Sequence, residues 1–269
     1  MTTRQSATIR QPAVAGSFYP GDKHQLQGLI EEYLENKDHL QHETNIKALI
    51  VPHAGYIYSG PIAASAYRLL KNRCGHIRRV VLLGPSHRIA LRGIAVPSDD
   101  AFHTPLGDIP LDKAGIALML TQPQVKILDQ AHAYEHSLEV QLPFLQSVLT
   151  EFCLLPIVVG AIDAEAVAAL LRLVLNDENT LIVISSDLSH YHPYQQACAI
   201  DQHTSEQIEA KNWHLQGEQA CGAYPLNGLL KLAAEKSWSI NTLDQRNSGD
   251  TAGDKDRVVG YGAYVVYQQ

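Results

Sequence analysis

The sequence predicts an α/β fold in which helices flank a central mixed, largely parallel sheet. Apolar runs alternate with helical patterns along the 269 residues, which is typical of layered α/β proteins. Three of the runs, IKALIV, VVLLG and LIVIS, are apolar on successive residues, as strands covered on both faces must be. No repeat, low-complexity tract or linker marks a boundary, so we expect one domain over residues 1–269.

The expected elements follow from these patterns in chain order. Pro61 and Pro225 each suit the first turn of a helix. The polar, glycine-rich segment 237–256 predicts an exposed loop before the last strand. We expect strands near 46–52, 79–84, 93–97, 153–159, 179–185 and 257–267, and helices near 23–35, 61–71, 112–121, 137–149, 163–175, 195–211 and 225–236.

Composition argues against several classes of partner. The formal net charge is −7 and no run of lysine and arginine occurs, so we expect no nucleic-acid partner. No apolar stretch reaches the roughly 18 residues of a membrane span, and the first residues carry no apolar signal region. We therefore expect a cytoplasmic protein with no membrane partner. The four cysteines form no CxxC pair, which fits a reducing compartment: Cys74, Cys153, Cys198 and Cys221.

Polar, chemically active side chains follow three of the expected strands. His53 ends the first, His87 the second, and Asp187 and His190 the strand at 179–185. The carboxyl ends of parallel strands form the crevice in which ligands of open α/β sheets bind. One such histidine is equally well explained by a helix cap or a buried hydrogen bond. Several converging imidazoles favour a metal site.

Six motifs resemble those of the Memo family, also described as protein B of the AmmeMemoRadiSam set. The resemblance runs in order from Ala15 to Gly228 and implies one Memo-like domain over the chain. It also implies a fold similar to that of the class III extradiol dioxygenases, which are non-heme iron enzymes, although no reaction is securely established for the family. The motifs are AGSFYP, PHAGYIYSG, LGPSHR, EHSLEVQLPFL, SSDLSHY and CGAYPLNG.

The family's site is described as two histidines and a cysteine. Carried onto this sequence, the resemblance implies His53, His87 and Cys221 as ligands of one metal ion per chain. Fe(II) is the first expectation, with Cu or Zn as alternatives. Cys221 lies just ahead of Pro225, near an expected helix N-terminus, which predicts a lowered thiol pKa. The alternative is a small buried hydrophobic residue, which the residues alone would favour.

The candidate catalytic residues are His190, Asp187 and His136. An imidazole can accept and donate a proton near neutral pH, so His190 is the candidate proton carrier. Asp187 would orient His190 or a metal-bound water, or else serve as a turn or cap residue. His136 precedes the expected helix 137–149 and would point into the same crevice.

Three classes of function remain open, and whether the chain is an enzyme at all is undecided. One is a non-heme iron redox or oxygenase-type enzyme, with a small molecule or peptide in the crevice. A cysteine ligand departs from the two-histidine, one-carboxylate site of the extradiol enzymes, which puts ring cleavage in doubt. If Cys221 is structural, Asp187 becomes the third ligand. The other classes are a zinc-dependent hydrolase and a non-catalytic metal- or peptide-binding module.

Overall fold

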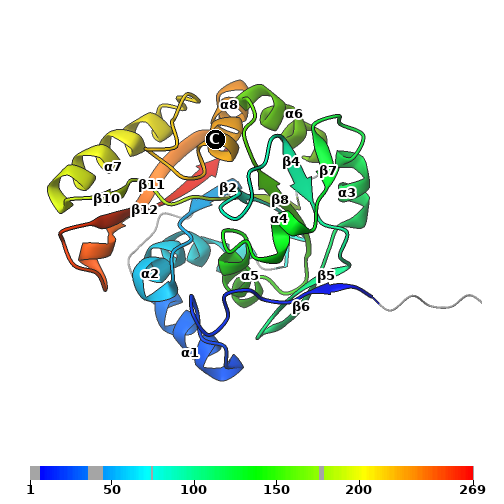
Figure 1. The fold of residues 1–269 in the computed structure, drawn as a ribbon, viewed down its shortest axis with the longest axis horizontal. Coiled ribbons are helices and arrows are strands. Elements are labelled where there is room, and N and C mark those ends of the chain that lie inside the picture. The colour runs from blue at the N-terminus through cyan, green and yellow to red at the C-terminus, as the bar shows by residue number, and fades with distance from the viewer. Residues whose placement is uncertain (1–6, 36–44, 74, 176–178, 269) are drawn as a thin grey trace, which may run out of the picture.

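The computed structural model describes residues 7–35, 45–73, 75–175 and 179–268, and its centre is a large mixed sheet (Figure 1). Among these residues the sheet has nine strands in the order β10-β12-β2-β9-β3-β8-β4-β7, with β11 paired to β12. The strands are β2 (Ile46–Val51), β3 (Arg79–Pro85), β4 (Ile94–Val96), β7 (Val125–Ile127), β8 (Cys153–Val159), β9 (Thr180–Ser185), β10 (His190–His192), β11 (Ser239–Asn247) and β12 (Val258–Tyr267).

The parallel strands are the middle of this sheet. β2, β9, β3 and β8 are neighbours and all parallel, whereas β12 and β4 join them in the antiparallel direction. All six residues of β9 are buried, because helices cover both faces. The predicted mixed sheet is confirmed, and its middle strands are parallel.

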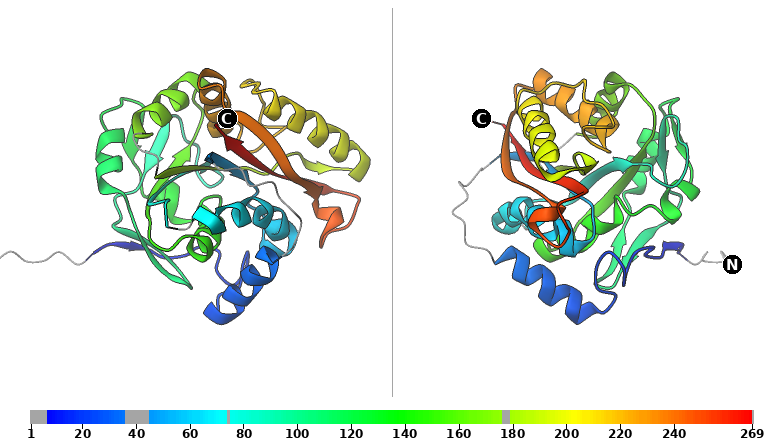
Figure 2. Two further views of the ribbon diagram at one scale, coloured as in Figure 1. Left: turned by 180° about the vertical axis from the view of Figure 1, so that it is seen from behind. Right: turned by 60° about the vertical axis from the view of Figure 1, so that its left-hand side comes forward.

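Helices lie on both sides of the sheet (Figures 1 and 2). α6 and α8 lie together on one side, where α8 packs on β3 and β9, and α1, α2 and α5 lie on the other. α7 packs against β11 and β12. None of the helices in the described parts of the chain is long and apolar enough to cross a membrane. The α-helices are α1 (Lys23–Leu34), α2 (Tyr56–Tyr67), α3 (Lys113–Met119), α4 (Gln130–Ala133), α5 (Leu142–Val148), α6 (Ala164–Val174), α7 (Tyr194–Glu209) and α8 (Ala223–Glu235), and the 3-10 helices are η1 (Arg68–Arg73), η2 (Glu139–Gln141) and η3 (Ser248–Asp250).

A small second sheet anchors the N-terminal segment to the rest of the molecule. It contains β1 (Ile9–Arg10), β5 (Ala101–Thr104) and β6 (Gly107–Pro110) in the order β1-β5-β6. The buried carboxylate of Glu139 then accepts hydrogen bonds from the Arg10 guanidinium (2.6 Å), the Ala13 and Val14 backbone N–H groups and the Tyr19 hydroxyl. This network holds residues 10–19 against the 3-10 helix η2 (Glu139–Gln141), which directly precedes α5.

Three expectations about the elements are wrong. Residues 239–247 are not loop but strand β11, because backbone pairing with β12 and cover from α7 stabilise a segment whose side chains are mostly polar. Pro61 lies inside α2, which begins at Tyr56. The helix expected at 137–149 begins only at Leu142, after η2, with Pro143 in its first turn.

The sheet order brings the candidate residues together. Because β2, β9 and β3 are adjacent and parallel, the segments that follow them leave the same edge of the sheet. His53 follows β2, Asp187 follows β9 and His87 follows β3. The loop that carries His136 reaches the same edge, as does Cys221, which lies two residues before α8.

Candidate metal centre

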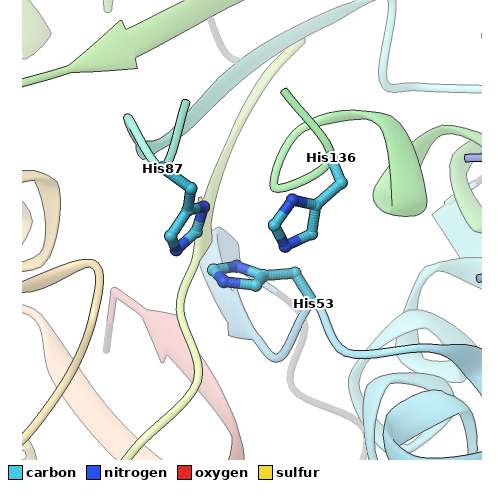
Figure 3. Close-up of side chains that lie close together, drawn as sticks. All are labelled: His53, His87 and His136. Atoms are coloured by element: carbon cyan, nitrogen blue, oxygen red, sulfur yellow. The ribbon is translucent and has the colours of Figure 1, made fainter. Parts of the chain in front are cut away.

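Three histidines converge at this edge (Figure 3). One ring nitrogen from each of His53, His87 and His136 lies within 4.8 Å of the others. The ring centroids are 5.1 Å apart for His53 and His87, 4.8 Å for His87 and His136, and 5.5 Å for His53 and His136. Imidazole nitrogens at such separations can bind a common ion of the zinc, iron or copper type.

The hydrogen bonds of His53 determine which of its nitrogens is free. Its Nδ1 lies 3.0 Å from Ser185 Oγ. Ser185 donates its only hydrogen to the Ser137 carbonyl (2.6 Å) and also accepts from Gln141 Nε2. His53 Nδ1 must therefore donate to Ser185, which leaves Nε2 with a free lone pair. Burial and the neighbouring imidazoles hold the pKa of His53 well below its usual value, so the ring is neutral.

His87 is held in the same way by Glu135. The buried Glu135 carboxylate accepts hydrogen bonds from the His87 backbone N–H (2.6 Å), from His87 Nδ1 (2.9 Å) and from the Ser137 N–H. A carboxylate can only accept, so Nδ1 carries a hydrogen, and the lone pair of the neutral ring lies on Nε2. Burial alone would raise the pKa of Glu135, but the hydrogen bonds that its carboxylate accepts from His87 and from the Ser137 N–H lower it to about 2. This orientation of an imidazole by a carboxylate is typical of metal ligands.

His136 is oriented less firmly. Its ring packs on Phe18 at 4.8 Å between centroids, and its Nδ1 lies 3.4 Å from Glu135 Oε1 without a hydrogen bond. Burial lowers the pKa of His136 to about 4. A buried nitrogen without a hydrogen-bond partner is unfavourable in a closed core. A ligand bound at this site would supply the missing partner.

Cys221 contacts His53. Its Sγ lies 3.2 Å from His53 Nε2 and accepts a hydrogen bond from the Asp187 backbone N–H at 3.3 Å. The expected low thiol pKa is wrong for the protein without metal, because burial and the Asp187 carboxylate raise the pKa of Cys221. The thiol is therefore protonated and donates to the free lone pair of His53. The helix N-terminus predicted from Pro225 is present, but it does not offset burial.

Asp187 contacts the segments that carry His53 and Cys221 and not the His190 ring. Its Oδ1 accepts from the His53 backbone N–H at 2.7 Å, and its Oδ2 lies 4.0 Å from His53 Nε2. Burial raises the pKa of Asp187 to about 7. The expectation that Asp187 orients His190 is wrong, because His190 Nδ1 donates instead to the Leu188 carbonyl at 2.8 Å.

His190 nevertheless lies near the cluster. Burial lowers its pKa, and His87 lowers it further. Its Nδ1 carries the hydrogen given to Leu188, so its Nε2 can accept a proton.

Sequence reasoning missed the residues that orient His53 and His87. Ser185, Gln141 and Glu135 fix the imidazoles of His53 and His87, and none of the three was predicted as a site residue. One signal was available for Glu135, since a carboxylate beside a candidate ligand histidine is a common supporting residue. For Ser185 and Gln141 no local signal exists, because the contacts of Ser185 with His53 and of Gln141 with Ser185 depend on the tertiary arrangement. Of the other cysteines, neither Cys153 nor Cys198 forms a disulfide among the described residues, and Cys74 lies outside them.

Comparison with known proteins identifies the family. A family model described as Memo-like protein matches residues 10–265. The chain belongs to the Memo family. It is 39% identical over 270 residues to a MEMO1 family protein of Aquifex aeolicus, which covers 94% of this chain and 97% of the relative. It is 34% identical to the MEMO1 family protein MK0963 of Methanopyrus kandleri, over 95% of this chain and 98% of the relative.

A solved structure is similar in fold. The uncharacterized protein JW3007 from Escherichia coli K12 matches with a TM-score of 0.53 and 15% identity, covering 83% of this chain and 100% of that chain. At this identity the match shows the fold alone. The resemblance to the Memo family is thus confirmed, and the mixed α/β fold is shared with a solved protein.

Proposed function

We propose that this Memo-family protein binds one metal ion per chain through Nε2 of His53, Nε2 of His87 and Sγ of Cys221, and that the site carries out redox chemistry on a small molecule. One observation carries the proposal. Both histidines give their Nδ1 hydrogens to protein acceptors, which leaves both Nε2 atoms free, and the Cys221 sulfur lies 3.2 Å from one of them.

The donor set suits a transition metal. Imidazole favours iron, copper and zinc, and a thiolate adds charge and softness, whereas magnesium and calcium prefer oxygen ligands. We propose Fe(II) as the first candidate, with Cu or Zn as alternatives. When bound, iron or copper would supply one-electron chemistry that side chains lack. Three protein ligands leave room for a small molecule in the crevice.

The surrounding residues would handle protons. His190 has a free Nε2 and is the proposed proton carrier. Asp187 holds the His53 backbone with its carboxylate and the Cys221 sulfur with its N–H, so it fixes the distance between two proposed ligands. His136 lies against both His53 and His87 and would contact the bound small molecule.

A second donor set replaces Cys221 with His136. The observation in its favour is the mutual approach of the three imidazoles to within 4.8 Å. Three imidazoles and an open position are also the arrangement of zinc hydrolases, so this set favours hydrolysis. The two donor sets predict different metal contents for the Cys221→Ala and His136→Ala variants.

Metal analysis tests the proposal. Purified under reducing, oxygen-free conditions and supplied with Fe(II), the chain is expected to hold about one equivalent, because three ligands define one site. His53→Ala, His87→Ala and Cys221→Ala should each abolish binding, whereas His136→Ala and the matched control Cys198→Ala should retain it. Metal loss in His136→Ala with retention in Cys221→Ala would instead establish the three-histidine set. Full metal content in all four site variants would refute both.

Glu135→Gln is expected to weaken metal binding about 10- to 100-fold, the range seen when a residue supporting a ligand histidine is changed. The substitution removes the charge that holds the hydrogen on His87 Nδ1 while keeping the shape of the side chain. Competition with a chromophoric chelator measures the affinity for zinc. Glu151→Gln, at an exposed side chain that pairs only loosely with Arg78, is the control. An affinity equal to that of the control would show that Glu135 does not support the ligand.

A further inference from the structure

The loop that carries His190 is held in an unfavourable conformation. Tyr191, directly after His190, has a φ of +61°, in the left-handed region that side chains other than glycine rarely adopt. Its ring is largely exposed and lies under the Arg257 guanidinium, so packing of the ring into the core does not explain the conformation. Strain of this kind persists only where surrounding contacts impose it.

Those contacts engage each backbone polar group of the two residues before His190. Leu188 N–H donates to the Gly260 carbonyl and Gly260 N–H donates to the Ser189 carbonyl, both at 2.8 Å. The Leu188 carbonyl accepts from the His190 ring. The remaining group, the Ser189 N–H, donates to Asp201 Oδ1 at 2.9 Å.

A buried aspartate such as Asp201 is an unusual acceptor for the Ser189 N–H. It lies on α7, is 2% exposed, and has no cation within ion-pair distance among the described residues. Burying a carboxylate is costly unless it forms strong hydrogen bonds. Its carboxylate lies directly on Gly260, where a Cβ would collide with it. A glycine at position 260 therefore leaves the space that the Asp201 carboxylate occupies.

We propose that Asp201 is a positioning residue that, through Ser189 and Gly260, fixes the tautomer and orientation of His190. The proposal rests on the proposed role of His190 as proton carrier. By holding the Leu188 carbonyl under the ring, Asp201 keeps the hydrogen on Nδ1 and the lone pair of Nε2 free. α7 thus contributes to the site without touching it.

The tautomer of His190 is the direct readout. In the zinc-supplied full-length chain, nitrogen chemical shifts of ¹⁵N-labelled histidine should show the Nδ1–H form in roughly tenfold excess, as one net hydrogen bond provides. Asp201→Ala should reduce this excess to about twofold or less, and Asp201→Asn, which keeps an acceptor oxygen, should restore most of it. Gly260→Ala should reproduce the effect of Asp201→Ala, whereas Gly28→Ala, at a glycine with open space around it, should not.

Several outcomes would overturn the proposal. An unchanged His190 tautomer in folded Asp201→Ala or Gly260→Ala would make Asp201 a purely structural residue, whatever the loss in Tm. Asp201 would also lose the positioning role if Asp201→Asn reduced the tautomer excess as much as Asp201→Ala does. If Asp201→Ala does not fold, Gly260→Ala and Asp201→Asn decide. Because the tautomer is measured without turnover, a shift in these variants with no loss of activity in His190→Ala would uphold the positioning and reject the proton-carrier role.

Discussion

His190→Ala is expected to slow turnover about 10²- to 10⁴-fold while leaving the metal content intact, which is the usual contribution of a positioned proton carrier. The assay is oxygen consumption by the Fe(II) protein with a catechol-like substrate. His192→Ala, which removes the other histidine of β10, is the matched control and should keep its activity.

The same assay separates the classes of function. No oxygen consumption with catechols, combined with hydrolysis of activated esters by the zinc form, would reject the redox proposal in favour of a hydrolase. No turnover in either assay, combined with measurable peptide binding, would favour a binding module. Full activity in His190→Ala would remove His190 from the mechanism.

Glu139→Ala is expected to lower the free energy of unfolding by about 3–5 kcal/mol, the range for breaking a buried ion pair from one side. The change leaves Arg10, a residue that is 6% exposed, without its carboxylate partner. It also removes the acceptor of two backbone N–H groups and of the Tyr19 hydroxyl. Urea denaturation of the metal-free protein measures the effect.

Glu165→Ala is the control for this prediction. Glu165 also pairs with two cations, Arg172 and Lys231, but it lies on the surface, where water screens the pairs. Its replacement should change the stability far less. Equal effects of the two substitutions would show that the Glu139 network does not hold residues 10–19 in place.

Much of the sheet was readable from local patterns. Residues 153–159 match β8, and 179–185 match β9 to within one residue. These strands are apolar on successive residues because both faces are buried, and that leaves a signal in the sequence. β11 has no such signal, because its side chains are mostly polar. Its stability comes from backbone pairing with β12, which no local sequence pattern reveals.

The candidate site was readable in part. The sequence indicated His53, His87 and Cys221 through motifs at strand ends and a helix start, and the structure brings Cys221 onto His53. The protonation of Cys221 could not be read in this way, since the raised pKa depends on burial and on Asp187, 34 residues away along the chain.

The sequence by itself determined the family, the layered α/β architecture and the identity of most residues that line the site. These properties depend on periodicity and on short motifs, which are local. Only the tertiary structure decided which ring nitrogen of His53 and of His87 carries the hydrogen, that Ser185 and Glu135 hold these rings, and that Asp201 on α7 supports the His190 loop. Hydrogen bonds require atoms from different strands and helices to lie within about 3 Å, and that proximity exists only once the sheet order is established.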